Sequence, residues 1–245
     1  MQINKINNLL ELFYSQYQKQ NKDNIFLESL KEPKKKYSWE EVFLNIIKLS
    51  KEISKHINKG DRCFLISENR PEWLITDLSI MLSGGVTVPA YTTYTERDYE
   101  YIIDNCEPTI IFISDNIQYE KIKNLIPKKK FIKRVIIFDS INIDNNNLYQ
   151  NIKDIFEYKN YENINFLNLD IQRKDVACII YTSGTQGNPK GVMLSHGGIL
   201  NNCEGSCNLL KPIISNKTRF LTWLPLSHSY EHTVQFVQIA VAAKV

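Results

Sequence analysis

Cysteine is scarce in this chain, and the five cysteines among its 245 residues stand at irregular spacing. An odd number without a regular pattern argues against a disulfide framework and favours a reducing compartment. The chain also lacks any run of ~18–20 apolar residues that could span a membrane, and residues 1–8 are too polar for a secretory signal. We therefore expect a cytoplasmic protein.

The chain also has no large excess of charge of one sign. The 30 basic residues nearly balance the 27 acidic ones, which leaves a net charge of +3 and no broad basic footprint for nucleic acid. Two short lysine runs, at 34–36 and 128–130, are most simply solvated loop or helix ends. The alternative for these runs is a peripheral contact with the anionic inner face of a membrane.

The chain does hold enough apolar side chains for a substantial core, with 43% apolar and 23% charged residues. Helices are predicted at 38–58, where Ser38 and Glu41 have the form of a capping box, from Pro71 to Gly84, at 96–105 and at 117–126. Apolar strands are predicted at 63–67, 86–88, 109–113 and 135–138. Apolar strands separated by helices of about three turns indicate a parallel sheet covered on both faces, so the predicted fold class is α/β.

The predicted organisation has two blocks, residues 1–170 and 171–245. The stretch 141–168 is rich in Asn and Tyr without a clean period, and we interpret it as the connection between them. The second block opens with an apolar strand at 176–181 that leads directly into a polar, glycine-containing loop. Candidate chemistry is concentrated at this junction.

The loop at 182–191 combines three hydroxyl side chains, three glycines and one lysine. Glycines let backbone N–H groups turn toward an anion, hydroxyls add donors, and a lysine supplies a mobile positive charge, so the composition suits a polyphosphate. The spacing fits neither a Walker A loop nor a G-x-G-x-x-G dinucleotide fingerprint. A polar turn between two strands is the alternative reading.

Residues 181–192 read Tyr-Thr-Ser-Gly-Thr-Gln-Gly-Asn-Pro-Lys-Gly-Val. This segment resembles the signature loop of the superfamily that contains AMP-forming acyl-CoA synthetases, peptide synthetase adenylation domains and luciferases. Gln186 stands where the family usually has a second threonine, which removes one hydroxyl but keeps a hydrogen-bonding side chain. The resemblance implies that the loop binds the β- and γ-phosphates of ATP through Thr182, Ser183, Gly184, Thr185, Gln186, Gly187 and Lys190.

The chain continues from this loop into Ser195 and His196, at the expected start of a helix. His196 has the appearance of a general base, but Ser and His side chains at a helix start more often satisfy free backbone groups. We therefore predict a structural role for both residues.

A second motif lies at 221–233, Leu-Thr-Trp-Leu-Pro-Leu-Ser-His-Ser-Tyr-Glu-His-Thr. We expect an apolar strand over 220–226 that breaks at Pro225 and leads into a helix. The segment is similar to the Leu-Pro-Leu-x-His segment of long-chain acyl-CoA synthetases, which implies a place beside the acyl carboxylate for His228 and a substrate-binding role for Glu231. His232 stands where many relatives carry arginine, and we assign it no role.

Two upstream segments, at 67–73 and 85–91, are similar to parts of the first subdomain of long-chain synthetases and favour a fatty acid substrate. For Asn69 and Arg70 we expect loop or cap packing. Cys203, Cys207, His228 and His232 superficially resemble a zinc pattern. The gap of 20 residues between the pairs includes the predicted strand, and we therefore predict no metal ligands in this chain.

The resemblance implies a two-step reaction with ATP, Mg²⁺ and CoA. A fatty acid carboxylate attacks the α-phosphorus of ATP, and CoA then displaces AMP to form the thioester; Lys190 and His228 are the implied catalytic residues. Family members are more than twice as long, so we interpret the chain as part of the large adenylate-forming domain, truncated before its second half and the small carboxy-terminal domain. The apolar helix expected over 233–243 shows no stop signal, and the resulting fragment is expected to be inactive alone.

Two alternatives remain open at this point. The first is an adenylating ligase with another acyl substrate or a carrier-protein acceptor. The second is an inactive fragment that binds nucleotide or a protein partner. Nothing in the sequence determines the acyl chain length or the oligomeric state.

Overall fold

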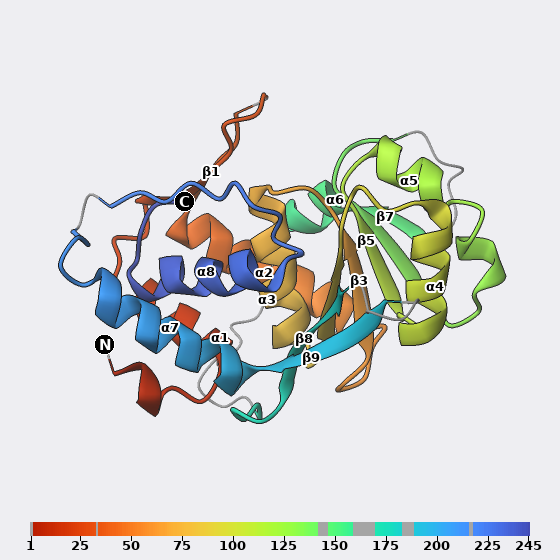
Figure 1. Ribbon diagram of the computed structural model, residues 1–245. Helices are drawn as coiled ribbons and strands as arrows, with labels where there is room; N and C mark the ends of the chain where they lie inside the picture. The colour runs from red at the N-terminus through yellow and green to blue at the C-terminus, as the bar shows by residue number, and fades with distance from the viewer. Residues whose placement is uncertain (1, 33, 142–146, 159–169, 183–188, 216–217) are drawn as a thin grey trace.

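The computed structural model of the protein describes residues 2–32, 34–141, 147–158, 170–182, 189–215 and 218–245. A seven-stranded sheet with the order β7-β6-β5-β3-β4-β8-β9 forms its centre (Figure 1). All pairings in this sheet are parallel except that between β8 and β9, which confirms the predicted α/β class. The strands are β3 (Arg62–Ile66), β4 (Val86–Ala90), β5 (Ile110–Ile113), β6 (Arg134–Ile137), β7 (Tyr149–Asn151), β8 (Val176–Thr182) and β9 (Lys190–Ser195).

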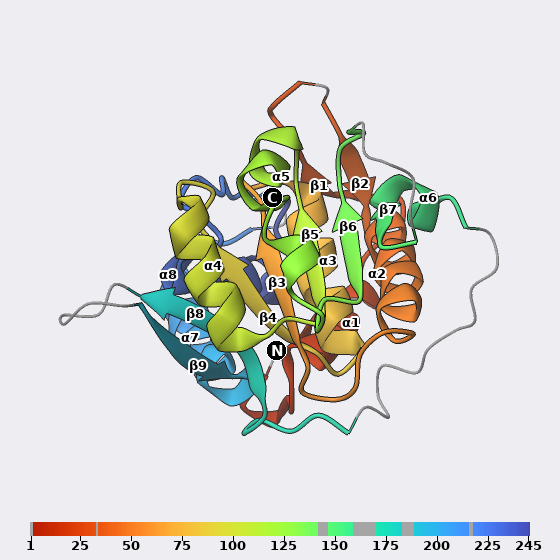
Figure 2. The same cartoon turned by 90° about the vertical axis from the view of Figure 1, so that its right-hand side faces the viewer.

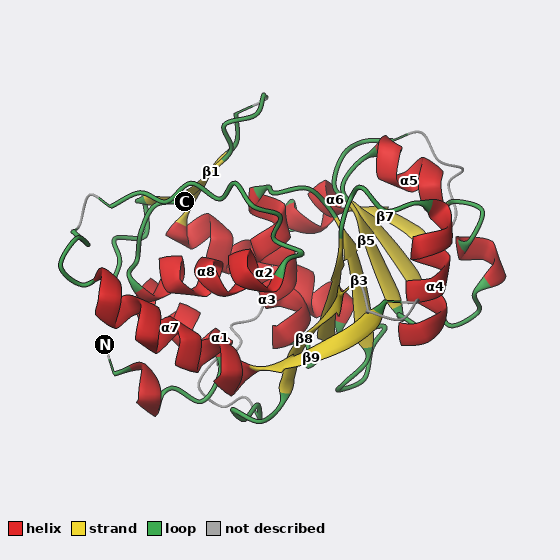
Figure 3. Ribbon diagram, viewed as in Figure 1, coloured by secondary structure: helices red, strands yellow, loops and turns green. Residues whose placement is uncertain are grey.

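Helices cover both faces of this sheet (Figure 3). The α-helices are α1 (Leu9–Tyr17), α2 (Trp39–Ile53), α3 (Pro71–Leu82), α4 (Glu96–Cys106), α5 (Asn116–Ile122), α6 (Ile152–Phe156), α7 (His196–Leu210) and α8 (Ser229–Ala240), with short 3-10 helices η1 (Ile3–Lys5) and η2 (Ile126–Lys128). Side chains along β3 alternate between two apolar cores: Cys63 and Leu65 join the helices of one face, and Phe64 and Ile66 join α4 and α5 on the other. Because both sides of the central strands β3, β4 and β5 are buried, these strands are mostly apolar.

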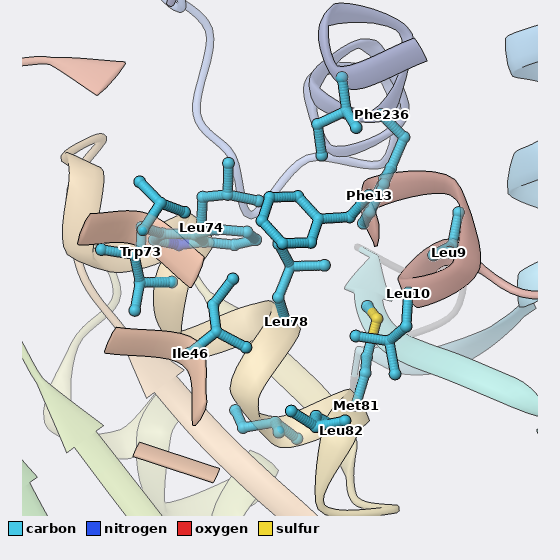
Figure 4. Close-up of a cluster of buried hydrophobic side chains, with 14 of the residues drawn as sticks. Leu9, Leu10, Phe13, Ile46, Trp73, Leu74, Leu78, Met81, Leu82 and Phe236 are labelled. Carbon is cyan, nitrogen blue, oxygen red and sulfur yellow. The ribbon is translucent and has the colours of Figure 1, made fainter. Parts of the chain in front are cut away.

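The larger core lies between the sheet and the helices α1, α2, α3 and α8. Figure 4 shows Phe13 of α1, Ile46 of α2, Trp73 and Leu78 of α3 and Phe236 of α8 in this cluster. All five side chains are fully buried. Every residue of α3 is buried as well, so this helix is packed on all sides and fixes the position of the elements around it.

Helix boundaries follow the local signals only in part. Ser38 and Glu41 form the predicted capping box, yet α2 ends at Ile53, five residues before the expected end. Pro71 occupies the first turn of α3, and Gly84 reverses the chain after it with φ +78°. Residues 149–156 were expected to be part of a connection, but they form β7 and α6, since the backbone of Tyr149–Asn151 pairs with β6 without any apolar pattern. The rest of that stretch lies largely outside the described residues.

The last helix was expected over 233–243 without a stop, and these bounds were wrong, because α8 spans Ser229–Ala240. Helix α8 ends at Ala240, where the N–H of Ala243 donates to Gln238 O (3.0 Å) and the N–H of Ala242 donates to Ile239 O (2.9 Å). This pair of bonds is the Schellman arrangement, which places one residue in the left-handed region. That residue is Ala242, with φ +51°. Because glycine usually takes this position, an alanine there left no signal in the sequence.

After α8 the chain pairs with the beginning of the protein. Strand β1 (Ile25–Glu28) pairs antiparallel with β2 (Lys36–Ser38), and Val245 exchanges two backbone hydrogen bonds of 2.8 Å with Phe26 and Glu28. On its other side, Lys244 forms a parallel bridge with Arg219. These segments form a second, smaller layer of extended chain, which packs against α2 through the stacked rings of Phe26 and Trp39.

The lysine runs are partly neutralised by carboxylates. Lys35 pairs with Glu72 at 2.5 Å and Lys36 with Glu28 at 2.9 Å, and Lys129 contacts Asp104. These contacts support the interpretation of the runs as ordinary surface and packing charges. In the part of the chain that the structure describes, none of the helices is long and apolar enough for a bilayer crossing.

Strands β8 and β9 extend the same sheet as the first block of the chain, through the pairing of Cys178 with Thr87. The hairpin lies at one edge of the sheet, with α4 on one side and α7 on the other (Figure 2). The division of the chain at residue 170 stays a prediction.

Candidate active site

The hairpin of β8 and β9 carries the two ends of the predicted phosphate loop. Thr182 and Lys190 are register partners at the end where the loop joins the two strands. Both side chains are exposed, and no hydrogen bond or ion pair to another described residue occupies the Lys190 ammonium. Residues 183–188 lie outside the described residues, so the roles of Ser183, Gly184, Thr185, Gln186 and Gly187 stay predictions. The Lys190 ammonium, with the Thr182 hydroxyl opposite it, is suited to bind phosphate oxygens.

The last glycine of the motif has a packing function. Gly191 faces Tyr181 across the hairpin, and a Cβ atom at this position would lie 2.9 Å from Ile179 Cγ2 and 3.2 Å from Tyr181 Cζ. Tyr181 is buried and its hydroxyl donates to Asn105 Oδ1 of α4. The absence of a side chain at Gly191 thus lets the tyrosine lie flat against the hairpin and join it to α4.

Helix α7 begins directly after β9, and its first residues have the predicted structural role. Ser195 is the N-cap, and its Oγ accepts a hydrogen bond from Gly198 N–H at 3.1 Å. His196 is 2% exposed, and its Nδ1 accepts from Leu9 N–H at 3.3 Å. Burial lowers the pKa of His196 to about 4, since the charged imidazolium would lose its hydration. His196 is therefore a neutral residue that joins α7 to α1.

The strand predicted over 220–226 does not form, and that prediction was wrong. Beyond the bridge between Arg219 and Lys244, none of the described residues pairs with this segment as a neighbouring strand would. Trp223 is 73% exposed, which is incompatible with a buried strand. An apolar run predicts a strand only where a neighbouring strand is available for its backbone, and here the side-chain amide of Asn69 takes that place.

His228 is the N-cap of α8, the helix that follows this segment. Its Nδ1 accepts a hydrogen bond from Tyr230 N–H at 3.2 Å, and the side chain is exposed. A neutral ring that accepts at Nδ1 carries its proton on Nε2. The Nε2–H group can therefore donate to an anion in front of the helix, and the amino end of α8 adds a favourable dipole.

Glu231 lies in the first turn of α8 and is 2% exposed. Its Oε1 has no hydrogen-bond partner among the described residues. Burial raises the pKa of this carboxyl group, because the ionised form loses hydration. Its substrate-binding role stays a prediction.

His232 has a partner that sequence reasoning missed. Its Nε2 lies 2.9 Å from Asp77 Oδ2 of α3, and both side chains are essentially inaccessible to solvent. Burial lowers the pKa of His232, but the Asp77 carboxylate more than offsets this effect, and the net pKa is raised. The pair joins α3 to α8 one turn after His228. The available signal was Asp77 itself, because a carboxylate in an otherwise buried helix requires a partner.

The four residues of the zinc-like pattern do not share one environment. Cys203 is buried, His228 is exposed, and His232 is paired with Asp77. Among the residues with described positions, no group of three or more His, Cys, Asp or Glu side chains is arranged as a metal site.

A cavity of about 470 Å³ lies beside the 219–226 segment. Apolar side chains from four parts of the chain form much of its wall, and Gln235 of α8 adds a buried amide whose Oε1 has no partner within the described residues. The apolar wall includes Leu27, Leu74, Phe220, Leu226 and Val245.

Comparisons with known proteins agree with this architecture. Residues 14–245 match the family described as AMP-binding enzyme. The chain is 31% identical to Long chain acyl-CoA synthetase 3 of Arabidopsis thaliana over 226 residues, which are 86% of this chain and 33% of that protein. It is 28% identical to Fatty acyl-CoA synthetase A of Dictyostelium discoideum, covering 77% of this chain and 29% of that protein. The chain thus spans about a third of the length of these relatives.

Solved structures show the same fold at lower identity. ATP-bound MatB from Rhodopseudomonas palustris has a TM-score of 0.75 at 22% identity, over 96% of this chain and 44% of that one. A red-emitting luciferase from Phrixothrix hirtus has a TM-score of 0.81 at 20% identity, over 97% of this chain and 46% of that one. At these identities the likeness concerns the fold alone.

Proposed function

Because the chain belongs to the AMP-binding enzyme family, we propose that it forms the phosphate- and carboxylate-binding part of an AMP-forming ligase that joins a long-chain fatty acid to CoA. Relatives named as long-chain and fatty acyl-CoA synthetases support the fatty acid as substrate. The ATP-bound state of one protein with the same fold supports ATP as co-substrate.

The observation that carries this proposal is the loop end of the β8–β9 hairpin. Thr182 and Lys190 are exposed register partners at the carboxyl end of a parallel strand, and ligands of α/β sheets bind at such ends. Lys190 would contact the β- and γ-phosphates together with the loop donors from Ser183 to Gly187. Strand β3 runs parallel in the same sheet. Asn69, just after the carboxyl end of β3, is hydrogen-bonded to the segment that leads to His228. Both proposed binding elements thus follow the carboxyl ends of parallel strands in one sheet, which supports the proposal.

In the first step, a carboxylate oxygen attacks the α-phosphorus of ATP, and the bond to the bridging oxygen breaks with release of pyrophosphate. The difficulty is the approach of two anions. Lys190 would offset part of the repulsion and stabilise the charge that develops on the leaving pyrophosphate. The Nε2–H group of His228 would hold the fatty acid carboxylate by a hydrogen bond. Mg²⁺ that accompanies ATP would supply further charge neutralisation.

In the second step, the thiolate of CoA attacks the acyl carbonyl carbon, and AMP leaves. We propose that the apolar cavity beside residues 219–226 receives part of the acyl chain, since Leu74, Phe220 and Leu226 expose carbon surface to it. Glu231, in the first turn of α8, is not part of the wall of this cavity, and its proposed contact with the substrate is a separate one.

A different acid, or a carrier protein in place of CoA, is the second candidate. The relatives named above favour the fatty acid, and the assay described next tests which acid is activated. We further propose that residues 1–245 do not complete the reaction alone, because Thr182 and Lys190 are exposed to water, where each charge interaction is weaker than in a closed site. Purified residues 1–245 should therefore release little AMP from ATP with CoA and a long-chain fatty acid; turnover near that of an intact synthetase would contradict this part of the proposal.

The direct test is ATP–pyrophosphate exchange that depends on the added carboxylate. A chimera in which residues 1–245 replace the matching part of an active long-chain relative would be assayed with fatty acids of increasing length and with amino and aromatic acids. We expect exchange with long-chain fatty acids. Equal exchange without any acid, or exchange only with an amino acid or aromatic acid, would contradict the proposed substrate.

A further inference from the structure

The side chain of Asn69 makes three hydrogen bonds to one distant segment. Its Nδ2 donates to Leu224 O at 2.7 Å and to Thr222 O at 3.3 Å, and its Oδ1 accepts from Leu226 N–H at 3.0 Å. These partners are 153–157 positions further along the chain. One amide thus uses both donors and its acceptor on three alternate residues, in the way that a neighbouring strand would.

Apart from Asn69, one side-chain hydrogen bond within the described part of the chain reaches this segment, from Gln238 Nε2 to Thr222 Oγ1 at 3.3 Å, and its backbone has little further pairing. Among the described residues, the backbone of 221–226 has one further hydrogen bond, which Pro225 O accepts from His228 N–H at 2.9 Å. Leu221 and Trp223 point into solvent, with exposed fractions of 64% and 73%. Pro225 has no N–H group to contribute. The path of the segment therefore depends strongly on the Asn69 amide.

Asn69 is itself fixed to the sheet. It lies between β3 and α3, and the next residue, Arg70, donates to Glu72 and to Asp139, both at 2.9 Å. The Arg70 guanidinium also lies 5.4 Å from the centre of the Phe138 ring. Glu72 is 2% exposed, so one of these ion pairs is buried. The loop that carries Asn69 is thus anchored at the end of β6 and at the start of α3.

The consequence concerns His228, two residues after the last contact of Asn69. Leu226 and Ser227 are buried, and the turn from Pro225 to His228 leads directly into α8. We infer that Asn69 is a positioning residue, which holds the 222–226 segment and thereby places the His228 imidazole at the start of α8. The catalytic consequence rests on the proposed function, because it requires that His228 binds the substrate carboxylate.

The structural part can be measured on residues 1–245 without any substrate. Asn69→Ala removes all three hydrogen bonds, and we expect at least about tenfold faster hydrogen exchange at the Leu226 amide. The indole signal of Trp223 should shift, whereas those of the buried Trp39 and Trp73 should not. Unchanged exchange at Leu226 would overturn the inference.

Two further variants keep this measurement decisive. Asn69→Asp retains an acceptor for Leu226 N–H but loses both donors, so Leu226 should stay protected while the Trp223 signal shifts. This variant decides the matter if Asn69→Ala does not fold, and an unshifted Trp223 signal would then count against the inference. Ser67→Ala is the matched control, because Ser67 lies in the same loop, is buried, and donates only to the neighbouring Glu68 O.

The catalytic part is tested in the chimera by acid-dependent pyrophosphate exchange. We expect Asn69→Ala to lower kcat/KM for the fatty acid by about 10- to 100-fold through misplacement of His228, with KM for ATP unchanged. Ser67→Ala should leave both parameters unchanged. Faster hydrogen exchange at the Leu226 amide without any loss of kcat/KM would overturn the positioning role, while the proposed function would stand. A chimera without any exchange activity would contradict the proposed function, and the Leu226 measurement would still decide whether Asn69 holds the segment.

Discussion

Replacing Asp77 removes the only charged partner that the described residues offer to the His232 imidazole across the α3–α8 interface. The two side chains are 0% and 1% exposed, so water does not replace the lost partner. Removal of one member of a buried pair leaves an uncompensated group and costs about 3–5 kcal/mol. Replacement of both members by apolar side chains removes the desolvation penalty as well. We therefore expect Asp77→Leu and His232→Leu each to destabilise the protein by about 3 kcal/mol, and the double variant by much less than their sum.

Urea denaturation of the four proteins at pH 7 gives these free energies of unfolding and the coupling between the two sites. The expected coupling is about 2 kcal/mol or more, at the upper end of values for residues in contact. Additive effects of the two single replacements would refute the reasoning, because they would mean that the pair contributes nothing as a pair. Thr76→Val, on the adjacent buried position of α3, controls for the general sensitivity of this helix.

The same pair predicts a dependence of stability on pH. The pKa of His232 is raised in the folded protein, so the folded state binds a proton more tightly than the unfolded state does. The resulting stabilisation is complete below the unfolded pKa of about 6.5 and is lost as the pH rises toward the folded value, at up to about 1.4 kcal/mol per pH unit. The unfolding free energy should therefore fall between about pH 7 and pH 9. An equally steep fall in His232→Gln would assign the effect to another group.

Three further predictions concern single residues. Lys190→Ala should slow acyl-adenylate formation in the chimera by about 30- to 150-fold, or roughly 2–3 kcal/mol, with little change in acid binding; Lys174→Ala is the control, and an unchanged exchange rate would contradict the phosphate assignment. His228→Ala should impair the acid-dependent rate and leave ATP affinity within about twofold, whereas equal loss of both would contradict its place on the acyl side. Because burial lowers the pKa of His196 to about 4, wild-type stability should fall by about 3 kcal/mol between pH 6.5 and pH 4, and urea titrations should show a flatter acid limb for His196→Asn.

Local patterns in the sequence were sufficient for much of the fold. Strands that are apolar on both faces predict a parallel sheet, because only helices on both sides can bury them. The capping box of Ser38 and Glu41 and the proline at the start of α3 marked two helix starts, since these features act within one turn of chain. The strand before the phosphate loop and the structural role of His196 were predicted for the same reason. The loop roles of Ser183 to Gly187 stay predictions.

The elements that the sequence alone could not determine depend on partners far away in the chain. Residues 220–226 are apolar enough for a strand, yet their backbone is held by Asn69 instead of a second strand. The role of His232 could not be predicted, because it depends on Asp77, which α3 places opposite the imidazole in the folded protein. Two residues after the end of α8, Ala242 adopts the left-handed region because the following residues pair with β1, and the stability of that pairing offsets the local strain at Ala242. Short-range interactions determined where helices and strands begin, whereas burial and hydrogen bonding between residues more than 150 positions apart decided how the segment carrying His228 is held.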